Sequence, residues 1–173
     1  MIKRFLPDVY SENIYKVNYK KLKKRGVKCL LFDLDNTITP AREEVFYEET
    51  KKLFRKLEKD FRVILFSNNF RKRVSKFGDF YTLDIECLSL KPNKFKYKRI
   101  LKKYNYKSNE VAAIGDQLLT DINGANKVKM VSVLVNPISE IDEKETWFNR
   151  KIEKIIFNYY KKHDAFIKDR YYD

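Results

Sequence analysis

The amino-acid sequence predicts an α/β fold with a parallel sheet and helices on both of its faces. Short apolar runs with the length of strands alternate with segments whose apolar residues recur at helical spacing. The runs are continuous rather than alternating in polarity, which is typical of strands buried on both faces. At 173 residues the chain is long enough for one domain with one hydrophobic core.

Strands and helices alternate along a predicted core of about residues 26–136. The expected strands are 27–34, 62–66, 85–88, 111–114 and 130–135. A helix after the first strand has a face formed by Phe46, Leu53, Phe54 and Leu57. A later helix carries a stripe of Tyr97, Ile100, Leu101 and Tyr104. A short helix is expected at 121–127, before the last strand.

Both ends of the chain are expected to belong to one domain, residues 1–173. The segment 1–25 contains apolar and aromatic residues at Tyr10, Ile14, Tyr15, Tyr19 and Leu22. A C-terminal helix at about 146–162 has an apolar face of Phe148, Ile152, Ile155, Ile156 and Tyr159. Its charge lies elsewhere, at Arg150, Lys151, Lys154, Lys161 and Lys162. Each end could pack on the core or lie on an anionic membrane, and the pattern leaves both open.

The chain is strongly basic. It has 38 Lys and Arg against 24 Asp and Glu, a net charge of +14. Such a field attracts phosphates, anionic lipid or nucleic acid and says nothing about the fold. A hydrophobic fraction of 43% excludes a disordered polyelectrolyte.

The two cysteines and the apolar runs indicate a cytoplasmic protein. Cys29 and Cys87 lie in separate apolar runs without metal-binding spacing, so we expect buried thiols in a reducing compartment. No run approaches the roughly 18 apolar residues of a membrane span, and the first residues lack the apolar stretch of a signal peptide.

Polar residues follow four of the predicted strands, where open α/β sheets bind their ligands. They are Asp33 and Asp35 after the first strand, Ser67 and Asn68 after the second, Lys91 after the third, and Asp116 with Asp121 after the fourth. Taken singly, each has an ordinary interpretation as a surface lysine, a turn residue or a helix cap. Two carboxylates at the end of a buried strand are less easily explained without a metal or catalytic use.

The acidic pair predicts metal-assisted phosphoryl transfer. Asp33 and Asp35 would repel each other without a cation, and Mg²⁺ prefers such oxygen ligands, which Asp33 and Asp116 could supply. Asp33 can then act as the nucleophile and form an aspartyl-phosphate, while Asp35 transfers protons. We expect substrate phosphate to be bound by Ser67, Asn68 and Lys91.

These motifs, in this order, resemble the haloacid dehalogenase (HAD) superfamily, subfamily IIIA. Residues 33–37, Ser67, 91–92 and 115–121 are similar to its four motifs. The resemblance implies a Rossmann-like core and metal ligation by Asp33, Asp116 and the backbone carbonyl of Asp35. It also gives supporting roles to Thr37 and Asp121. Aspartates at both 33 and 35 favour a phosphatase over a dehalogenase.

The spacing of the motifs leaves no room for a cap domain, because 36–68 and 68–90 are used by core elements. The resulting open site fits a large substrate. Residues 5–8, 33–37, 66–69 and 148–150 resemble the YqeG branch, which is similar to the mitochondrial phosphatidylglycerophosphate phosphatases. This resemblance implies an anionic phospholipid substrate, phosphatidylglycerophosphate, and contact with the inner face of a membrane through the basic ends.

Other functions remain open. A HAD phosphatase could act on a nucleic-acid end or a phosphoprotein. A receiver-type signalling domain also combines a parallel sheet with an acidic site, but its acceptor aspartate follows the third strand. A nucleic-acid-binding protein would use the positive charge, although here the lysines and tyrosines are spread along the chain.

Overall fold

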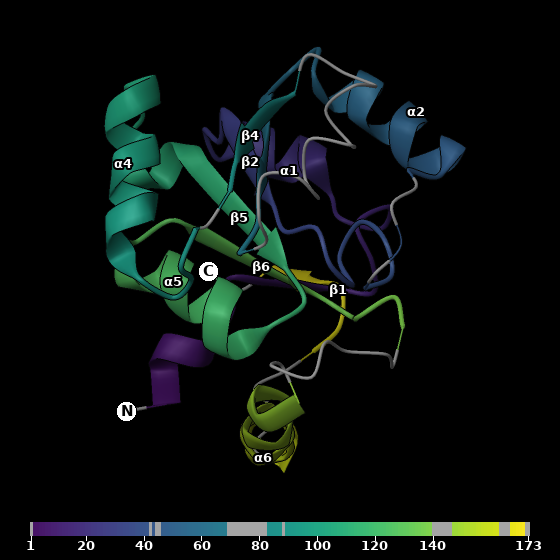
Figure 1. The fold of residues 1–173 in the computed structure, drawn as a ribbon, viewed down its shortest axis with the longest axis vertical. Coiled ribbons are helices and arrows are strands. Elements are labelled where there is room, and N and C mark those ends of the chain that lie inside the picture. The colour runs from purple at the N-terminus through teal and green to yellow at the C-terminus, as the bar shows by residue number, and fades with distance from the viewer. Residues whose placement is uncertain are drawn as a thin grey trace.

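A central sheet organises the computed structural model, which describes residues 2–41, 43, 46–68, 83–87, 89–139, 147–162 and 167–171 (Figure 1). The strand order is β4-β3-β2-β5-β6-β1-β7. All neighbours from β4 to β1 are parallel, and β7 pairs antiparallel with β1 at the edge. The strands are β1 (Val9–Ser11), β2 (Cys29–Phe32), β3 (Arg62–Phe66), β4 (Asp84–Glu86), β5 (Val111–Gly115), β6 (Val131–Val135) and β7 (Arg170–Tyr171). The predicted α/β class is confirmed.

The helices cover both faces because neighbouring residues of each strand point to opposite sides. Leu30 and Phe32 of β2 join the cluster under α1 (Tyr19–Lys24) and α2 (Glu48–Leu57). Cys29 and Leu31 join the cluster under α4 (Lys94–Tyr104) and α5 (Asn123–Lys127). Figure 1 shows α4 and α5 on one side of the sheet and α2 on the other.

Local sequence sets the helix ends. The Asn18 side chain accepts a hydrogen bond from the Lys21 N–H at the start of α1. At the start of α4, the Asn93 side chain accepts one from the Phe95 N–H at 3.0 Å. The helix ends at Asn105, which adopts the left-handed conformation with a φ of 55°.

The predicted core strands are present, with small shifts. β3 has the predicted bounds, whereas β2 is two residues shorter than the predicted 27–34 at each end, and Asp33 follows it in the turn that enters the site. β4 begins one residue before the predicted strand, and Leu88 lies outside the described residues. The expected helix at 121–127 is divided into a π-helical turn, η3 (Leu118–Ile122), and α5.

The N-terminal segment contributes a strand that the apolar pattern did not predict. Val9 of β1 is fully buried and lies opposite Val133 of β6. Ile14, Val17 and Leu22 join the same core cluster. Three residues are too few to show a pattern, so this strand is specified by its pairing with β6.

The C-terminal helix α6 (Trp147–Lys162) packs on the core through a face that only partly overlaps the predicted one, since Ile156 contacts the core as expected. Glu153 and Tyr160 are buried, and Phe157 forms an edge-to-face contact with Tyr10 of β1. Ile155 and Tyr159, expected on the apolar face, are 71% and 47% exposed. The inward stripe is therefore rotated relative to the predicted one.

Between β2 and β3 the described residues form α2 and its connections, without an inserted domain. Most of the second stretch considered for a cap, residues 69–82, lies outside the described part of the chain. None of the described helices combines the length and apolar character needed to cross a bilayer.

Candidate active site

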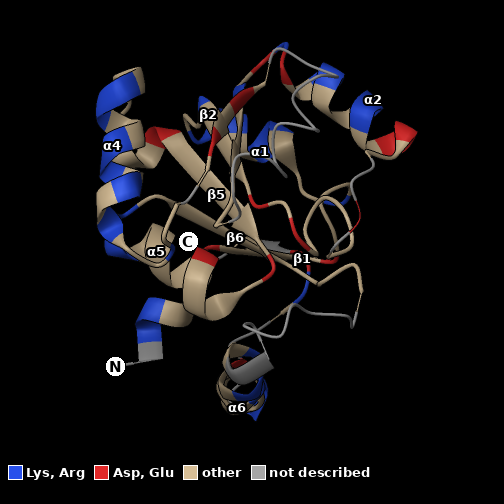
Figure 2. Cartoon of the chain, in the orientation of Figure 1, with Lys and Arg blue, Asp and Glu red and all other residues tan. Residues whose placement is uncertain are grey.

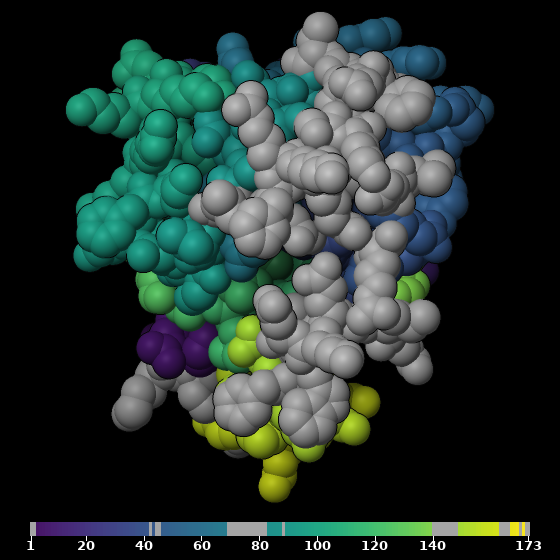
Figure 3. Space-filling model, viewed as in Figure 1, coloured from purple at the N-terminus to yellow at the C-terminus, as the bar shows by residue number. Residues whose placement is uncertain are grey.

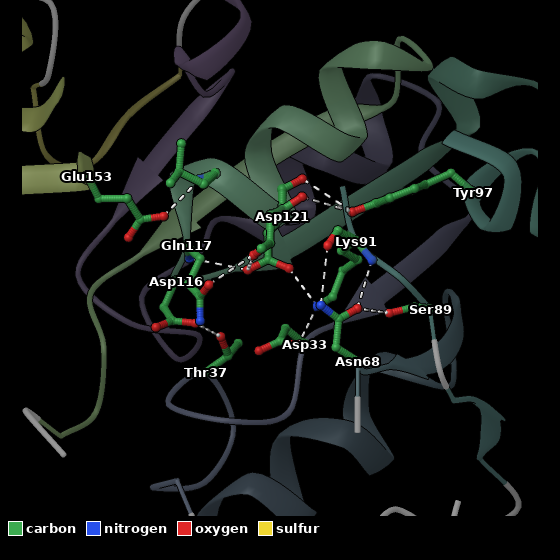
Figure 4. A network of polar contacts seen from close by, with 12 residues as sticks. Asp33, Thr37, Asn68, Ser89, Lys91, Tyr97, Asp116, Gln117, Asp121 and Glu153 are labelled. Atoms are coloured by element: carbon green, nitrogen blue, oxygen red, sulfur yellow. Dashed lines mark hydrogen bonds and ion pairs between the residues drawn. The ribbon is translucent and has the colours of Figure 1, made fainter. Parts of the chain in front are cut away.

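Three aspartates meet where β2 and β5 end (Figure 4). Asp33 follows β2 directly, and Asp116 follows β5. Asp121 lies in η3, which turns back over the end of β5. A carboxylate oxygen from each residue lies within 4.8 Å of the other two. The parallel sheet therefore brings together residues that are 83 positions (116 − 33) and five positions (121 − 116) apart in sequence.

Lys91 is the cation at the centre of this group. Its Nζ contacts Oδ1 of Asp33 and lies 2.6 Å from Oδ1 of Asp121. The side chain is 3% exposed. A lysine so deeply buried needs paired carboxylates, and it has two of them here.

Asn68 holds the turn that carries Lys91. Its Oδ1 accepts hydrogen bonds from the Ser89 hydroxyl at 2.7 Å and from the Lys91 N–H at 2.8 Å. Its Nδ2 donates to the Lys91 carbonyl at 3.3 Å. Ser67, which precedes it at the end of β3, is buried and donates its N–H to the Glu86 carbonyl. The phosphate-binding roles expected for Ser67 and Asn68 stay predictions.

Asp116 is held from two sides. The Thr37 hydroxyl donates to its Oδ1 at 3.1 Å, and Arg150 of α6 pairs with its Oδ2. Arg150 Nη1 also donates to the Asp116 carbonyl at 3.3 Å and to Glu153 Oε2 at 3.2 Å. Glu153 Oε1 accepts the N–H of Leu119, the second residue of η3, at 2.8 Å. Two α6 side chains thus connect to the two segments that carry Asp116 and Asp121.

Gly115 makes the close approach of Asp121 possible. A Cβ at this position would lie 2.6 Å from the Cβ of Asp121 and closer still to its carboxylate. The Gln117 N–H donates to Oδ2 of Asp121 at 3.2 Å, which fixes the carboxylate against the backbone. A side chain at 115 would displace Asp121 from this position.

Asp35 lies in the turn that follows Asp33 and is partly exposed. The next residue, Asn36, has a left-handed φ of 59°, which asparagine tolerates better than most residues. Its Oδ1 accepts hydrogen bonds from the Ala41 N–H at 3.1 Å and the Ser139 hydroxyl at 3.0 Å. The turn is thereby fixed with Asp35 beside the buried group.

Burial dominates the electrostatics of the site. It raises the pKa of Asp33 well above its usual value, although Lys91 opposes the shift. Burial also raises the pKa of Asp116, to about 6, against the opposing effects of Arg150 and Thr37. For Lys91, burial favours the neutral form, but Asp121 and Asp33 outweigh it and raise the pKa. The lysine stays protonated, while the carboxylates are costly to ionise without more positive charge.

The residues present fit a hard divalent cation. Asp33, Asp116 and Asp121 together carry −3 when ionised, and Lys91 with Arg150 supplies +2, which leaves −1 in a buried space. All three offer carboxylate oxygens, the ligands that Mg²⁺ prefers. The aspartate cluster could therefore hold a metal ion.

Hydrogen bonds and ion pairs join Asn68, Asp33 and Asp121 through Lys91. Asp116, with its partner Thr37, lies beside them, its carboxylate within 4.8 Å of the other two. Asp35 and Ser67 lie at the same strand ends. Sequence reasoning did not assign Arg150 or Glu153 to the site. It placed Arg150 among the charges away from the packing face, whereas the structure turns it inward to Asp116. Glu153 could have indicated this role, because it is a charged residue on the same helical face as Ile156 and Tyr160, which pack against the core.

Known structures share this fold. The HAD phosphatase from Thermococcus onnurineus superposes with a TM-score of 0.54 at 13% identity, covering 68% of this chain and 90% of that one. A HAD family enzyme from Bacteroides thetaiotaomicron, solved as a magnesium complex, gives a TM-score of 0.51 at 13% identity, covering 66% and 96%. The fold is that of the HAD hydrolases.

Sequence comparisons give the family. A family model described as HAD-hydrolase-like matches residues 90–142. The Probable phosphatase YqeG of Bacillus subtilis (strain 168) is 34% identical over 171 residues, covering 94% of this chain and 95% of that protein. Phosphatidylglycerophosphate phosphatase 1, chloroplastic/mitochondrial, of Arabidopsis thaliana is 23% identical over 148 residues, covering 80% of this chain and 42% of that protein. The chain belongs to the YqeG family of HAD phosphatases.

Proposed function

We propose that this chain is a magnesium-dependent phosphomonoester hydrolase that acts through an aspartyl-phosphate on Asp33. The observation that carries the proposal is the buried group of Asp33, Asp116 and Asp121 with Lys91 paired to two of them. Asp33, Asp116 and the backbone carbonyl of Asp35 would hold the metal. When bound, Mg²⁺ supplies positive charge that stabilises the phosphoryl oxygens.

The proposed reaction has two steps. A carboxylate oxygen of Asp33 attacks phosphorus, and the bond from phosphorus to the leaving oxygen breaks as Asp35 donates a proton to that oxygen. Asp35 then takes a proton from water, which attacks the same phosphorus and releases inorganic phosphate and the free carboxylate of Asp33. Lys91 and Ser67 hold the phosphoryl oxygens throughout. Partial exposure suits Asp35 to this exchange, because its proton must come from and return to solvent.

Phosphatidylglycerophosphate is the proposed substrate, with phosphatidylglycerol as the product at the inner face of a membrane. The Arabidopsis relative carries that activity in its name. The net charge of +14 favours an anionic substrate. A hollow of about 220 Å³ beside Asp116 has apolar walls that include Tyr10, Leu134 and Phe157, which suits the apolar part of an amphiphilic phosphate.

Phosphate release from phosphatidylglycerophosphate in mixed micelles tests the proposal. We expect release to require Mg²⁺ and to fall by roughly three orders of magnitude or more in Asp33→Asn, which lacks the nucleophile. Asp60→Asn, at an exposed aspartate that precedes β3 and so lies at the opposite end of that strand from Ser67, should keep wild-type activity. Equal release by Asp33→Asn would contradict the mechanism.

Substrate choice needs a parallel comparison. The same enzyme is assayed on a 5′-phosphorylated oligonucleotide and a phosphopeptide at equal concentration. Preference for either of these over the lipid would reject the proposed substrate while leaving the chemistry at Asp33 intact.

A further inference from the structure

Two large apolar side chains are exposed beside the turn that carries Lys91. Leu90 is 62% exposed and Phe95 is 71% exposed. Leu90 has a φ of 51°, a left-handed conformation that leucine seldom adopts. Strained, exposed positions of this kind cluster at functional sites.

The exposed position is held firmly. Asn68 Oδ1 accepts the Lys91 N–H at 2.8 Å, and the Leu90 carbonyl accepts the Asn93 N–H at 2.8 Å. Asn93 in turn caps α4 through the Phe95 N–H. Consecutive hydrogen bonds therefore fix the backbone on both sides of Leu90 and at the start of the helix that carries Phe95.

The adjoining helix is basic along its length. α4 contains no Asp or Glu, and six of its 11 residues are cationic: Lys94, Lys96, Lys98, Arg99, Lys102 and Lys103. Figure 2 shows Lys and Arg along α4, and in Figure 3 its teal surface forms one margin of the molecule. Lys103 pairs with Glu86, whereas Lys94, Lys98 and Arg99 are exposed and form no ion pair with a described residue.

We propose that this edge, formed by Leu90, Phe95 and the cations of α4, docks on an anionic lipid bilayer. Exposed apolar side chains flanked by lysines fit the boundary between headgroups and acyl chains. A single-stranded nucleic acid could use the lysines and stack on Phe95, but it gains little from an exposed leucine. The inference goes beyond the proposed function, because docking can be measured without turnover.

The geometry also links docking to the site. Leu90 directly precedes Lys91, whose Nζ contacts Asp33. A surface that receives Leu90 would therefore present its headgroups close to the proposed phosphoryl-binding lysine. This surface is separate from the basic ends of the chain, whose contact with a membrane stays a prediction.

Cosedimentation of the full chain with vesicles tests this surface. We expect the wild type to bind vesicles of phosphatidylglycerol and phosphatidylcholine, to bind pure phosphatidylcholine weakly, and to lose affinity as salt increases. Leu90→Asn and Phe95→Ser should each weaken binding about tenfold, because each removes apolar burial. Asparagine tolerates a left-handed φ, so Leu90→Asn should fold at least as well as the wild type.

Ile155→Ser is the matched control, because Ile155 of α6 is also 71% exposed. It should bind vesicles as the wild type does. Phe95→Ser should keep wild-type hydrolysis of p-nitrophenyl phosphate, which shows that the site is intact. The proposal is overturned if the wild type does not bind anionic vesicles, or if Leu90→Asn and Phe95→Ser bind them as the wild type does. It is also overturned if Ile155→Ser loses as much vesicle affinity as those two variants, or if the chain binds a single-stranded oligonucleotide and not the vesicles.

Discussion

The space beside Gly115 decides where the Asp121 carboxylate can lie. Gly115→Ala would place a Cβ inside van der Waals distance of that carboxylate, and backbone on one side limits how far Asp121 can retreat. We expect hydrolysis to fall by roughly 10- to 100-fold, since a shift of about 1 Å in a catalytic group has effects of this size. Steady-state rates with a soluble phosphomonoester measure the loss.

Gly26→Ala is the control for that substitution. Gly26 has a φ of +87° but no atom near its missing Cβ, so alanine should cost about 1–2 kcal/mol of stability without affecting activity. If Gly115→Ala and Gly26→Ala retain the same activity, the close approach to Asp121 has no catalytic consequence.

Arg150 fixes both the carboxylate and the carbonyl of Asp116. Removing a group that orients a metal ligand typically weakens metal affinity 10- to 100-fold, so Arg150→Gln should raise the dissociation constant for Mg²⁺ about tenfold. Loss of a positive charge near the metal acts in the opposite direction, and the orientation effect is expected to dominate. Isothermal titration with Mg²⁺ measures the change.

Two further variants separate the effect of Arg150 on the orientation of Asp116 from its effect on the packing of α6. Ile156→Ala loosens the attachment of α6 without touching Asp116, so it should lower the melting temperature and leave Mg²⁺ affinity unchanged. Arg150→Lys keeps the charge but lacks the planar fork, and should give an intermediate affinity. Wild-type or tighter binding by Arg150→Gln would show that Asp116 needs no such support.

At the scale of elements, the features that could be predicted were those that depend on a short stretch of sequence. Continuous apolar runs predicted β3 with its observed bounds, and the polar residues that follow the strands predicted the place where Asp33, Lys91, Asp116 and Asp121 meet. Because parallel strands end at the same edge of the sheet, the predicted topology also predicted that these side chains lie close together.

Features specified by distant partners were missed. β1 is three residues long and owes its place to β6, more than 100 residues later. The inward turn of Arg150 depends on Asp116, and the helical pattern of α6 alone favoured a rotated face. The sequence also could not show that the Asn68 side chain holds the Lys91 turn, whereas its expected phosphate-binding role stays a prediction.

The contribution of β1 can be measured through Val9. Its side chain is fully buried against β6, so Val9→Ala should lower the free energy of unfolding by about 1–3 kcal/mol. Activity below the unfolding transition should not change. Chemical denaturation checks this, with Ile155→Ala as an exposed aliphatic control that should stay within about 0.5 kcal/mol of the wild type. Equal stability of the two variants would mean that β1 adds little to the core.

Across the whole molecule, a positively charged protein surrounds a negatively charged site. The chain carries +14 overall, yet its buried aspartates exceed the cations that pair with them. The surface field attracts an anionic substrate over a distance set by the Debye length, about 8 Å at physiological salt. The acidic site attracts the cation at short range, where burial limits screening. The two attractions act on different partners and therefore do not cancel.

Metal binding should accordingly stabilise the whole fold. Mg²⁺ at about 100 times its dissociation constant stabilises the native state by about 2.7 kcal/mol, which corresponds to roughly 5–10 °C in the melting temperature of a domain this size. The metal-free pKa of Asp116 is raised to about 6 by burial, so Mg²⁺ must displace a proton below that pH. The increase in melting temperature on moving from EDTA to Mg²⁺ should therefore be larger at pH 8 than at pH 5. Asp116→Asn should abolish this increase in melting temperature at both pH values. A full increase in that variant would mean that the metal binds elsewhere.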